Sequence, residues 1–190
     1  MRRVWIAAVA GAVALAAGAC GGDDGDEEST NTTTASSTSA PTTTLDEETR
    51  KEEAAKAAYL AYWVAFERAS AEPVDPRSHD LQAWMTGNQA RLVVRNLEEM
   101  EASKQAARRP ANSRSRHRVS ATELQADGSV RITDCQVDDA VVYDTTSGAV
   151  INDAVVTNLI VATMVQEGDA WKVGLAERTK KWPGVVGCVV

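Results

Sequence analysis

The sequence predicts an α+β fold in which N-terminal helices, one long and two shorter, pack on a curved, mostly antiparallel sheet of about four to six strands. Three observations support this prediction. Between residues 46 and 106, apolar side chains recur every three or four positions, which is the period of an amphipathic helix. After Pro110 this period is lost and the pattern becomes that of strands. Short turn sequences separate these strands, as hairpins require.

The long helix is predicted over residues 46–70. Thr44 and Glu47 have the spacing of a capping box, in which both side chains bond to free backbone amides at the start of a helix. Pro73 and Pro76 break the pattern. One apolar face of this helix carries Ala55, Tyr59, Tyr62, Trp63, Phe66 and Ala69.

Two shorter helices follow. Asp75 before Pro76 is a favourable start for the first, which ends at Gly87. The second is predicted from about residue 89 to residue 106. The apolar residues of these two helices are Leu81, Trp84, Met85, Leu92, Val93, Leu97 and Met100.

Four long strands are predicted over residues 117–124, 130–143, 149–166 and 170–180. Residues 155–165 are apolar on both faces, which favours a central position for that strand. A curved sheet wrapped around the long helix would bury the helix's aromatic face. Four aromatic side chains are then candidates to line a ligand pocket, although core packing alone also explains them. These candidates are Tyr59, Tyr62, Trp63 and Phe66.

The N-terminus resembles the signal peptide of a bacterial lipoprotein. Arg2 and Arg3 precede 16 apolar residues, and small residues lead up to Cys20. The apolar run is short for a membrane span, which needs about 20 residues. We therefore expect a signal peptide over residues 1–19 and a lipid such as palmitate on Cys20, which would anchor the exported protein to the outer face of the cell membrane. Ordinary secretion and an uncleaved anchor are the alternatives.

Residues 20–44 contain acidic residues followed by a Ser/Thr run, with no large apolar side chain between Asp23 and Pro41. Such a segment buries too little apolar area to fold, so we predict a disordered tether. Thr-rich tethers of similar lipoproteins are sometimes glycosylated, and a plain linker is the alternative. The folded domain is predicted over residues 45–190.

Cys135 and Cys188 form an even pair in an exported domain, where disulfides persist. If they are joined, the closed loop contributes about 4 kcal/mol of stability in the loop-entropy model. Two free buried thiols are the alternative. His79 and His117 lack partners at ligand spacing, so we expect no metal and no cofactor.

The folded region carries 18 basic and 22 acidic residues, and this balance gives no overall positive field for nucleic acid. An arginine-rich stretch could meet anionic lipid headgroups or envelope polymers, or could simply keep a loop and an edge strand soluble. This stretch contains Arg108, Arg109, Arg114, Arg116, His117 and Arg118.

Four aspartates, Asp134, Asp138, Asp139 and Asp144, gather around one predicted strand but lack the spacing of a calcium loop. Solvated strand edges explain them. One of them could instead point into the pocket as a general base, although no acid partner can be identified.

Several segments resemble the nuclear transport factor two-like superfamily, whose fold is a cystatin-like α+β cone. The resemblance covers residues 50–188 and depends on Tyr59-Leu60-Ala61-Tyr62-Trp63, the paired shorter helices and the closing segment Asp169–Val173. The ending from Trp182-Pro183-Gly184 to Cys188, together with Asp134-Cys135, is similar to exported actinobacterial lipoproteins of this fold. The resemblance implies no single activity, because the fold serves isomerases, dehydratases, polyketide cyclases, transport factors and binding domains. No catalytic motif of these enzymes matches this chain, so no catalytic residue is assigned.

The leading functional prediction is a membrane-anchored envelope lipoprotein that is not an enzyme and binds a protein, a polymer or a small apolar ligand. One alternative is an isomerase- or dehydratase-type enzyme, which a pocket carboxylate facing a Tyr or His would favour. Another is an accessory subunit of an envelope transport system, since mycobacterial import systems have anchored subunits of this fold. An exposed apolar patch on the sheet would favour that role or a homodimer formed through the sheet.

Overall fold

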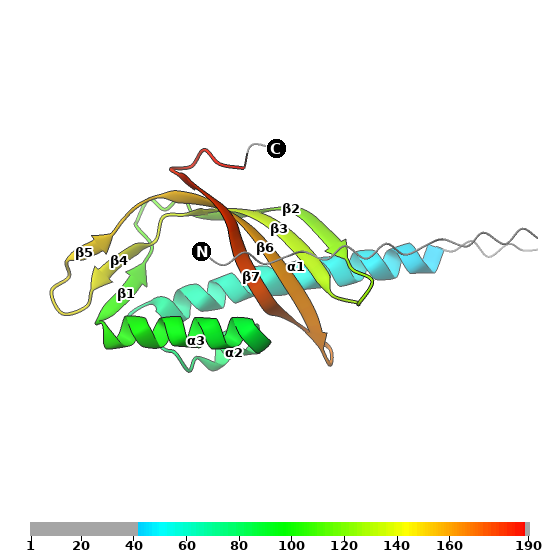
Figure 1. Ribbon diagram of the computed structural model, residues 1–190, viewed down its shortest axis with the longest axis horizontal. Helices are drawn as coiled ribbons and strands as arrows, with labels where there is room; N and C mark the ends of the chain where they lie inside the picture. The colour runs from blue at the N-terminus through cyan, green and yellow to red at the C-terminus, as the bar shows by residue number, and fades with distance from the viewer. Residues whose placement is uncertain (1–41, 189–190) are drawn as a thin grey trace, which may run out of the picture. The chain divides into compact units, whose positions relative to one another are not determined.

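The computed structural model describes residues 42–188, with side chains described from Glu47 onward. Within this part of the chain, three helices precede seven strands, so the α+β prediction is confirmed (Figure 1). The elements are α1 (Thr42–Ser70), α2 (His79–Ala83), α3 (Gly87–Ala102), β1 (Gln105–Arg108), β2 (Arg116–Leu124), β3 (Val130–Asp138), β4 (Val141–Asp144), β5 (Val150–Asn152), β6 (Val156–Glu167) and β7 (Ala170–Pro183). The predicted signal peptide, Cys20, the tether up to residue 41 and the Thr44 side chain lie outside the described residues and side chains. No helix among the described residues has the length and apolar character needed to cross a membrane.

The strands form two antiparallel sheets, where we expected one. The larger sheet has the order β2-β3-β6-β7, so β6 lies inside it, as its two apolar faces predicted. The smaller sheet has the order β1-β4-β5. A two-residue turn joins β6 to β7, and Gly168 adopts a φ of +61° at its first position, where glycine is favoured.

Two predicted strands are each divided in the structure. The segment 130–143 bends after Asp138 to pass from the large sheet into the small one, and the segment 149–166 bends at residues 153–155. Asp139 is buried at the first bend, where its carboxylate accepts hydrogen bonds from the Ser113 hydroxyl and the Arg114 backbone amide. These partners come from a distant loop, and the local pattern of apolar residues therefore gives no sign of the bend.

Residues 105 and 106 were wrongly predicted to belong to the third helix. The structure ends α3 at Ala102, and Lys104 then adopts a left-handed φ of 56°. Gln105–Arg108 have good intrinsic helix propensity, but their backbone pairs with β4 from Gln105–Asp144 to Arg108–Val141. Tertiary pairing overrides the local preference here.

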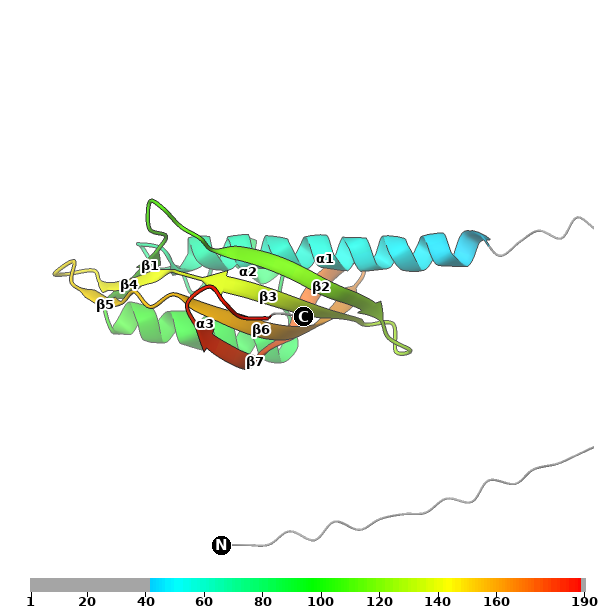
Figure 2. The ribbon, with the colours of Figure 1, turned by 90° about the horizontal axis from the view of Figure 1, so that it is seen from above.

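The helices cover one face of the large sheet, and the main hydrophobic core lies between the helices and this sheet (Figures 1 and 2). On α1 the buried positions follow the predicted helical period, with Tyr59 and Tyr62 almost completely enclosed. On β3 the residues Val130, Ile132 and Asp134 alternate with residues of the outer face, and all three are fully buried.

The C-terminal segment folds back over the other face of the large sheet (Figure 2). The predicted disulfide is confirmed: Cys135 on β3 is joined to Cys188, and their Cα atoms are 5.9 Å apart. Next to it, Thr157 donates a hydrogen bond to the Gly184 carbonyl over 2.8 Å. Gly187 packs so closely on β6, the strand of Thr157, that an added Cβ would lie 2.7 Å from the Thr157 Cβ.

Candidate functional site

A pocket of about 190 Å³ lies where α1, α3 and the small sheet meet the end of β3. Helix α1 contributes four residues, and α3 contributes Met100. The strands, the loop after β1 and the bend between β3 and β4 supply the rest. The lining residues are Trp63, Phe66, Glu67, Ser70, Met100, Ala107, Arg108, Arg109, Gln136, Asp138, Ala140 and Val142.

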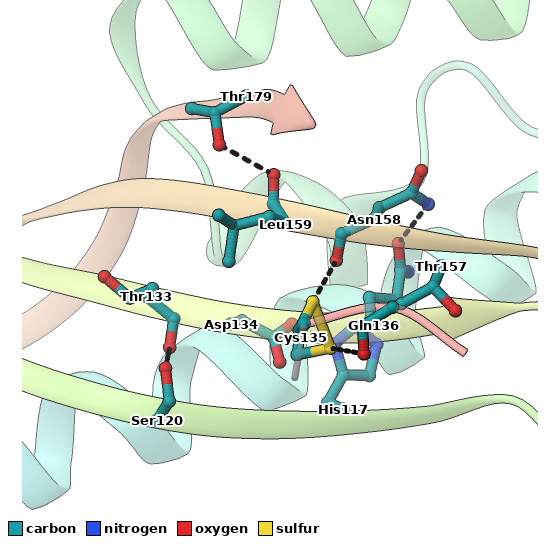
Figure 3. Close-up of a disulfide and its surroundings, with 12 residues drawn as sticks. His117, Ser120, Thr133, Asp134, Cys135, Gln136, Thr157, Asn158, Leu159 and Thr179 are labelled. Carbon is teal, nitrogen blue, oxygen red and sulfur yellow. Dashed lines mark hydrogen bonds and ion pairs between the residues drawn. A yellow bond between two sulfur atoms is a disulfide. The ribbon is translucent and has the colours of Figure 1, made fainter. Parts of the chain in front are cut away.

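Two buried polar side chains face this otherwise largely apolar pocket. Gln136 is only 6% exposed, and its Oε1 accepts a hydrogen bond from Nδ2 of Asn158 over 3.1 Å (Figure 3). Ser70 is 4% exposed, and its hydroxyl donates to the Glu67 carbonyl over 3.1 Å. Both side chains therefore have one partner in the protein and retain further hydrogen-bonding capacity.

The arginines at the rim of the pocket already have partners. Arg109 forms an ion pair with Glu67, and its Nη1 lies 3.7 Å from Oδ1 of the buried Asp139. Burial alone would raise the pKa of Asp139, but hydrogen bonds from the Arg114 amide and the Ser113 hydroxyl, together with the nearby Arg109 guanidinium, outweigh it and lower this pKa. Arg108 lies over the Tyr143 ring, with its guanidinium carbon 4.4 Å from the ring centroid, as in a cation–π contact.

The four predicted pocket aromatics divide into two pairs. Trp63 and Phe66 line the pocket, with ring centroids 5.8 Å apart in an edge-to-face contact. Tyr59 and Tyr62 are buried in the core and do not line it. The Tyr62 hydroxyl accepts a hydrogen bond from Nε2 of Gln89 over 2.8 Å, and burial raises the Tyr62 pKa to about 12.

Asp134 is the centre of a buried polar cluster with Tyr59 and His117. The Tyr59 hydroxyl donates to Oδ2 of Asp134 over 2.9 Å, and Nδ1 of His117 lies 2.6 Å from the same oxygen. Asp134 is completely enclosed, and the side chain of His117 is 12% exposed. Burial, together with the neighbouring Asp134 carboxylate, raises the pKa of Tyr59.

Trp63 stands between this cluster and the pocket. Its ring lies 5.2 Å from the His117 ring, centroid to centroid, and 6.2 Å from the Tyr59 ring. Asp134, His117 and Tyr59 are absent from the pocket lining, whereas Trp63 belongs to it. Nε1 of Trp63, Nε2 of His117 and Oδ1 of Asp134 are buried without a hydrogen-bond partner among the described residues. Such unpaired polar atoms are rare inside proteins.

The other three aspartates have separate positions. Asp138 lines the pocket, and one of its oxygens accepts the Ala140 amide over 3.1 Å. Asp139 holds the bend described above, and Asp144 caps the exposed turn at residues 145–148. Within the described residues, no group of three His, Cys, Asp or Glu side chains is arranged to hold a metal ion.

The arginine-rich stretch is dispersed by the fold. Arg108 and Arg109 lie at the pocket, whereas Arg114, Arg116 and Arg118 are exposed along the loop before β2 and on β2 itself. His117 alternates with these arginines on β2 and points to the opposite face, where it meets Asp134. These three exposed arginines do not line the pocket.

Exposed aliphatic side chains are found on β5, at the edge of the small sheet. Val150 and Ile151 are 53% and 51% exposed. A homodimer formed through the sheet stays a prediction.

Comparison with known proteins places the chain by fold alone. No family model matches the sequence. No curated protein matches it either. Among solved structures, the intermembrane space region of the chloroplast protein ARC6 is similar, with a TM-score of 0.55 and 12% sequence identity. The alignment covers 67% of this chain and 95% of that structure, and at this identity the likeness concerns the arrangement of helices and strands.

Proposed function

We propose that this protein is an exported, lipid-anchored domain that binds a small ligand in the pocket between α1, α3 and the small sheet. The single observation that carries the proposal is the pocket itself. It combines aromatic and apolar walls with a few buried polar groups, which is the composition typical of small-molecule sites. Its volume of about 190 Å³ is close to that of an engineered apolar cavity of about 150 Å³ that binds benzene, and it therefore suits a compact molecule.

The anchoring part of the proposal comes from the N-terminal sequence. The run of apolar and small residues before Cys20 is typical of a lipoprotein signal, and the paired cysteines agree with an oxidising compartment. A tethered binding domain would hold its ligand close to the membrane surface.

Native mass spectrometry of the full chain, extracted from the envelope of its source cells, tests ligand binding. Two detergents of different mass identify any signal that comes from the detergent. We expect a retained small molecule on the natural chain and on Ala121→Trp, which enlarges a side chain on β2 outside the pocket. Ala140→Trp fills the pocket and should remove the extra mass. Identical spectra for all three chains would contradict the proposal.

A second candidate function is an enzyme that uses a carboxylate, and the Tyr59–Asp134–His117 cluster favours it. A carboxylate held by a Tyr and a His is suited to general acid–base chemistry, but this cluster is separated from the pocket by Trp63. Incubating the retained ligand with the protein distinguishes the two functions. Turnover that is lost in His117→Gln while the ligand still binds would support an enzyme, and an unchanged ligand supports binding alone.

A further inference from the structure

We infer that the pocket selects an uncharged ring compound that carries a carbonyl oxygen, and that Gln136 is the residue that recognises this oxygen. The inference rests on the proposed ligand-binding function and adds the chemical class of the ligand. It depends on three features of the pocket: the free side of the Gln136 amide, the hydroxyl of Ser70 and the neutralised charges at the rim.

Gln136 presents unused hydrogen-bond donors to the pocket. Asn158, its direct partner in the pairing of β3 with β6, donates to Oε1 of Gln136 and fixes the amide plane (Figure 3). The Gln136 NH₂ group has no hydrogen-bond partner among the described residues. It is nevertheless open to a neighbouring space, because it is not among the polar atoms that are both unpaired and fully enclosed. Since Gln136 lines the pocket and is 6% exposed overall, the pocket is the space that this NH₂ group faces. Such a donor suits a ligand oxygen that accepts a hydrogen bond.

Ser70 adds a second polar point on the helix side. Because its proton is used on the Glu67 carbonyl, the hydroxyl oxygen faces a ligand only as an acceptor. A carbonyl compound with a neighbouring N–H or O–H group would satisfy both Ser70 and Gln136. The rest of the lining offers flat or flexible apolar contacts from Trp63, Phe66 and Met100, which fit a ring.

The charges around the pocket disfavour an ionic ligand. Arg109 is paired with Glu67 and lies near Asp139, and Arg108 lies over Tyr143. Asp138 adds a carboxylate that would repel an anion. A cation would in turn meet both arginines. A neutral ligand avoids both costs.

Ligand-detected NMR on the full chain tests this inference with three probes of nearly equal size: acetophenone, ethylbenzene and benzoate. Acetophenone and ethylbenzene differ mainly in the carbonyl oxygen. We expect acetophenone to bind about fivefold more tightly than ethylbenzene, in line with one neutral hydrogen bond, and benzoate to bind most weakly. In a separate protein-detected spectrum, acetophenone should also shift the side-chain amide resonances of Gln136.

Gln136→Leu should remove the preference for acetophenone, whereas Gln166→Leu, on the exposed end of β6, should leave it unchanged. Because Gln136→Leu also deprives Asn158 of its acceptor, its thermal unfolding is recorded in parallel. If that variant unfolds, Ser70→Ala replaces it, with benzamide as an additional probe. The benzamide NH₂ group can donate to the Ser70 hydroxyl, so benzamide should bind Ser70→Ala about fivefold more weakly than the natural chain, whereas the affinity for acetophenone should not change.

The outcomes separate the two proposals. Equal binding of acetophenone and ethylbenzene, or tightest binding of benzoate, would overturn the ligand class and leave the pocket as a binding site. Failure of all three probes, combined with no retained mass on the natural protein, would overturn the binding function itself.

Discussion

Asp134 is a fully enclosed carboxylate whose two partners come from different elements, Tyr59 on α1 and His117 on β2. Burying a carboxylate is costly unless hydrogen bonds compensate it, so these contacts bear on stability as well as on any chemistry. Removing the Asp134 carboxylate leaves both the Tyr59 hydroxyl and Nδ1 of His117 without this partner, whereas removing the Tyr59 hydroxyl leaves the contact with His117 in place.

We therefore expect Tyr59→Phe to lower the free energy of unfolding by about 1–2 kcal/mol and Asp134→Ala to lower it by about 3 kcal/mol or more. Urea unfolding of the oxidised protein measures both changes. Asp138→Ala is the matched control, because this aspartate is partly exposed, and it should cost less than 1 kcal/mol. An equal loss for Asp134→Ala and Asp138→Ala would show that the buried cluster does not stabilise the fold.

The three tyrosines should also make stability depend on alkaline pH. Burial raises the pKa of Tyr59 and takes that of Tyr62 to about 12, and the hydrogen bond to Glu72 raises the pKa of Tyr143. A raised pKa in the folded state stabilises the protein fully below pH 10, and this contribution is lost as pH rises toward 12. For Tyr62 alone the loss is about 2–3 kcal/mol across that range.

Ultraviolet titration checks this expectation, because ionised tyrosine absorbs near 295 nm. Little tyrosinate should form at pH 10–11 until the protein unfolds. The urea midpoint of Tyr62→Phe should fall less steeply between pH 10 and pH 12 than that of the natural chain. Three tyrosines that ionise freely near pH 10 in the folded protein would contradict the burial described above.

At the scale of single residues, sequence patterns predicted part of the candidate site. Helical spacing identified Trp63 and Phe66, which line the pocket, and the same spacing could not separate them from the enclosed Tyr59 and Tyr62. Asp134 was one of four aspartates considered as a pocket base. Its contact with His117 depends on how β2 pairs with β3, and such long-range pairing is not encoded in local periodicity. Gln136 was missed, although its position two residues after Asp134 places it on the same strand face.

At the scale of elements, the predicted helices and hairpins agree with the structure wherever local signals and tertiary contacts favour the same conformation. Apart from α2, which ends at Ala83 so that Gly87 begins α3 instead of ending the second helix, the exceptions are β1, whose sequence favours a helix, and the two bends that divide the long strands. All three lie at the small sheet, which also forms one side of the pocket. The sequence was therefore least informative at the place where the candidate site is built.

The C-terminal segment makes an element-level prediction through Gly187. An added methyl group would meet Thr157 and the Trp182 ring at 2.6–2.8 Å, closer than side-chain contacts allow. Gly187→Ala should therefore push the segment away from β6, lower stability by about 1–3 kcal/mol and speed reduction of the disulfide. Thiol trapping under dithiothreitol measures that rate. Gly174→Ala, whose new Cβ would lie 3.4 Å from Val165, should not change it.

At the scale of the whole molecule, attachment to the membrane depends on one residue in our proposal. Cys20→Ala should abolish labelling by a palmitate analogue and move the protein out of the membrane fraction, because the acyl chains contribute about 0.8 kcal/mol per buried CH₂ group. Cys188→Ala keeps the lipid site and removes only the disulfide, so it should still be labelled. Equal labelling of the natural chain, Cys20→Ala and Cys188→Ala would contradict the lipid anchor on Cys20.

The order of helices followed by strands was enough to predict the α+β class, because each amphipathic element must bury its apolar face on another. The division into two sheets was not predictable, since it depends on the buried contacts of Asp139 with a loop about 25 residues earlier in the chain. The disulfide was predictable from the number of cysteines and the expected compartment.

That disulfide also determines what a protease can do to the molecule. Lys180 and Lys181 are exposed near the end of β7, where a trypsin-like enzyme would cut the backbone. The fragment beyond the cut would still be bonded to β3 through Cys188 and Cys135. A nicked chain would therefore keep its mass on a non-reducing gel and separate into two pieces only after reduction, so cleavage of the backbone and loss of the C-terminal segment are distinct events in this protein.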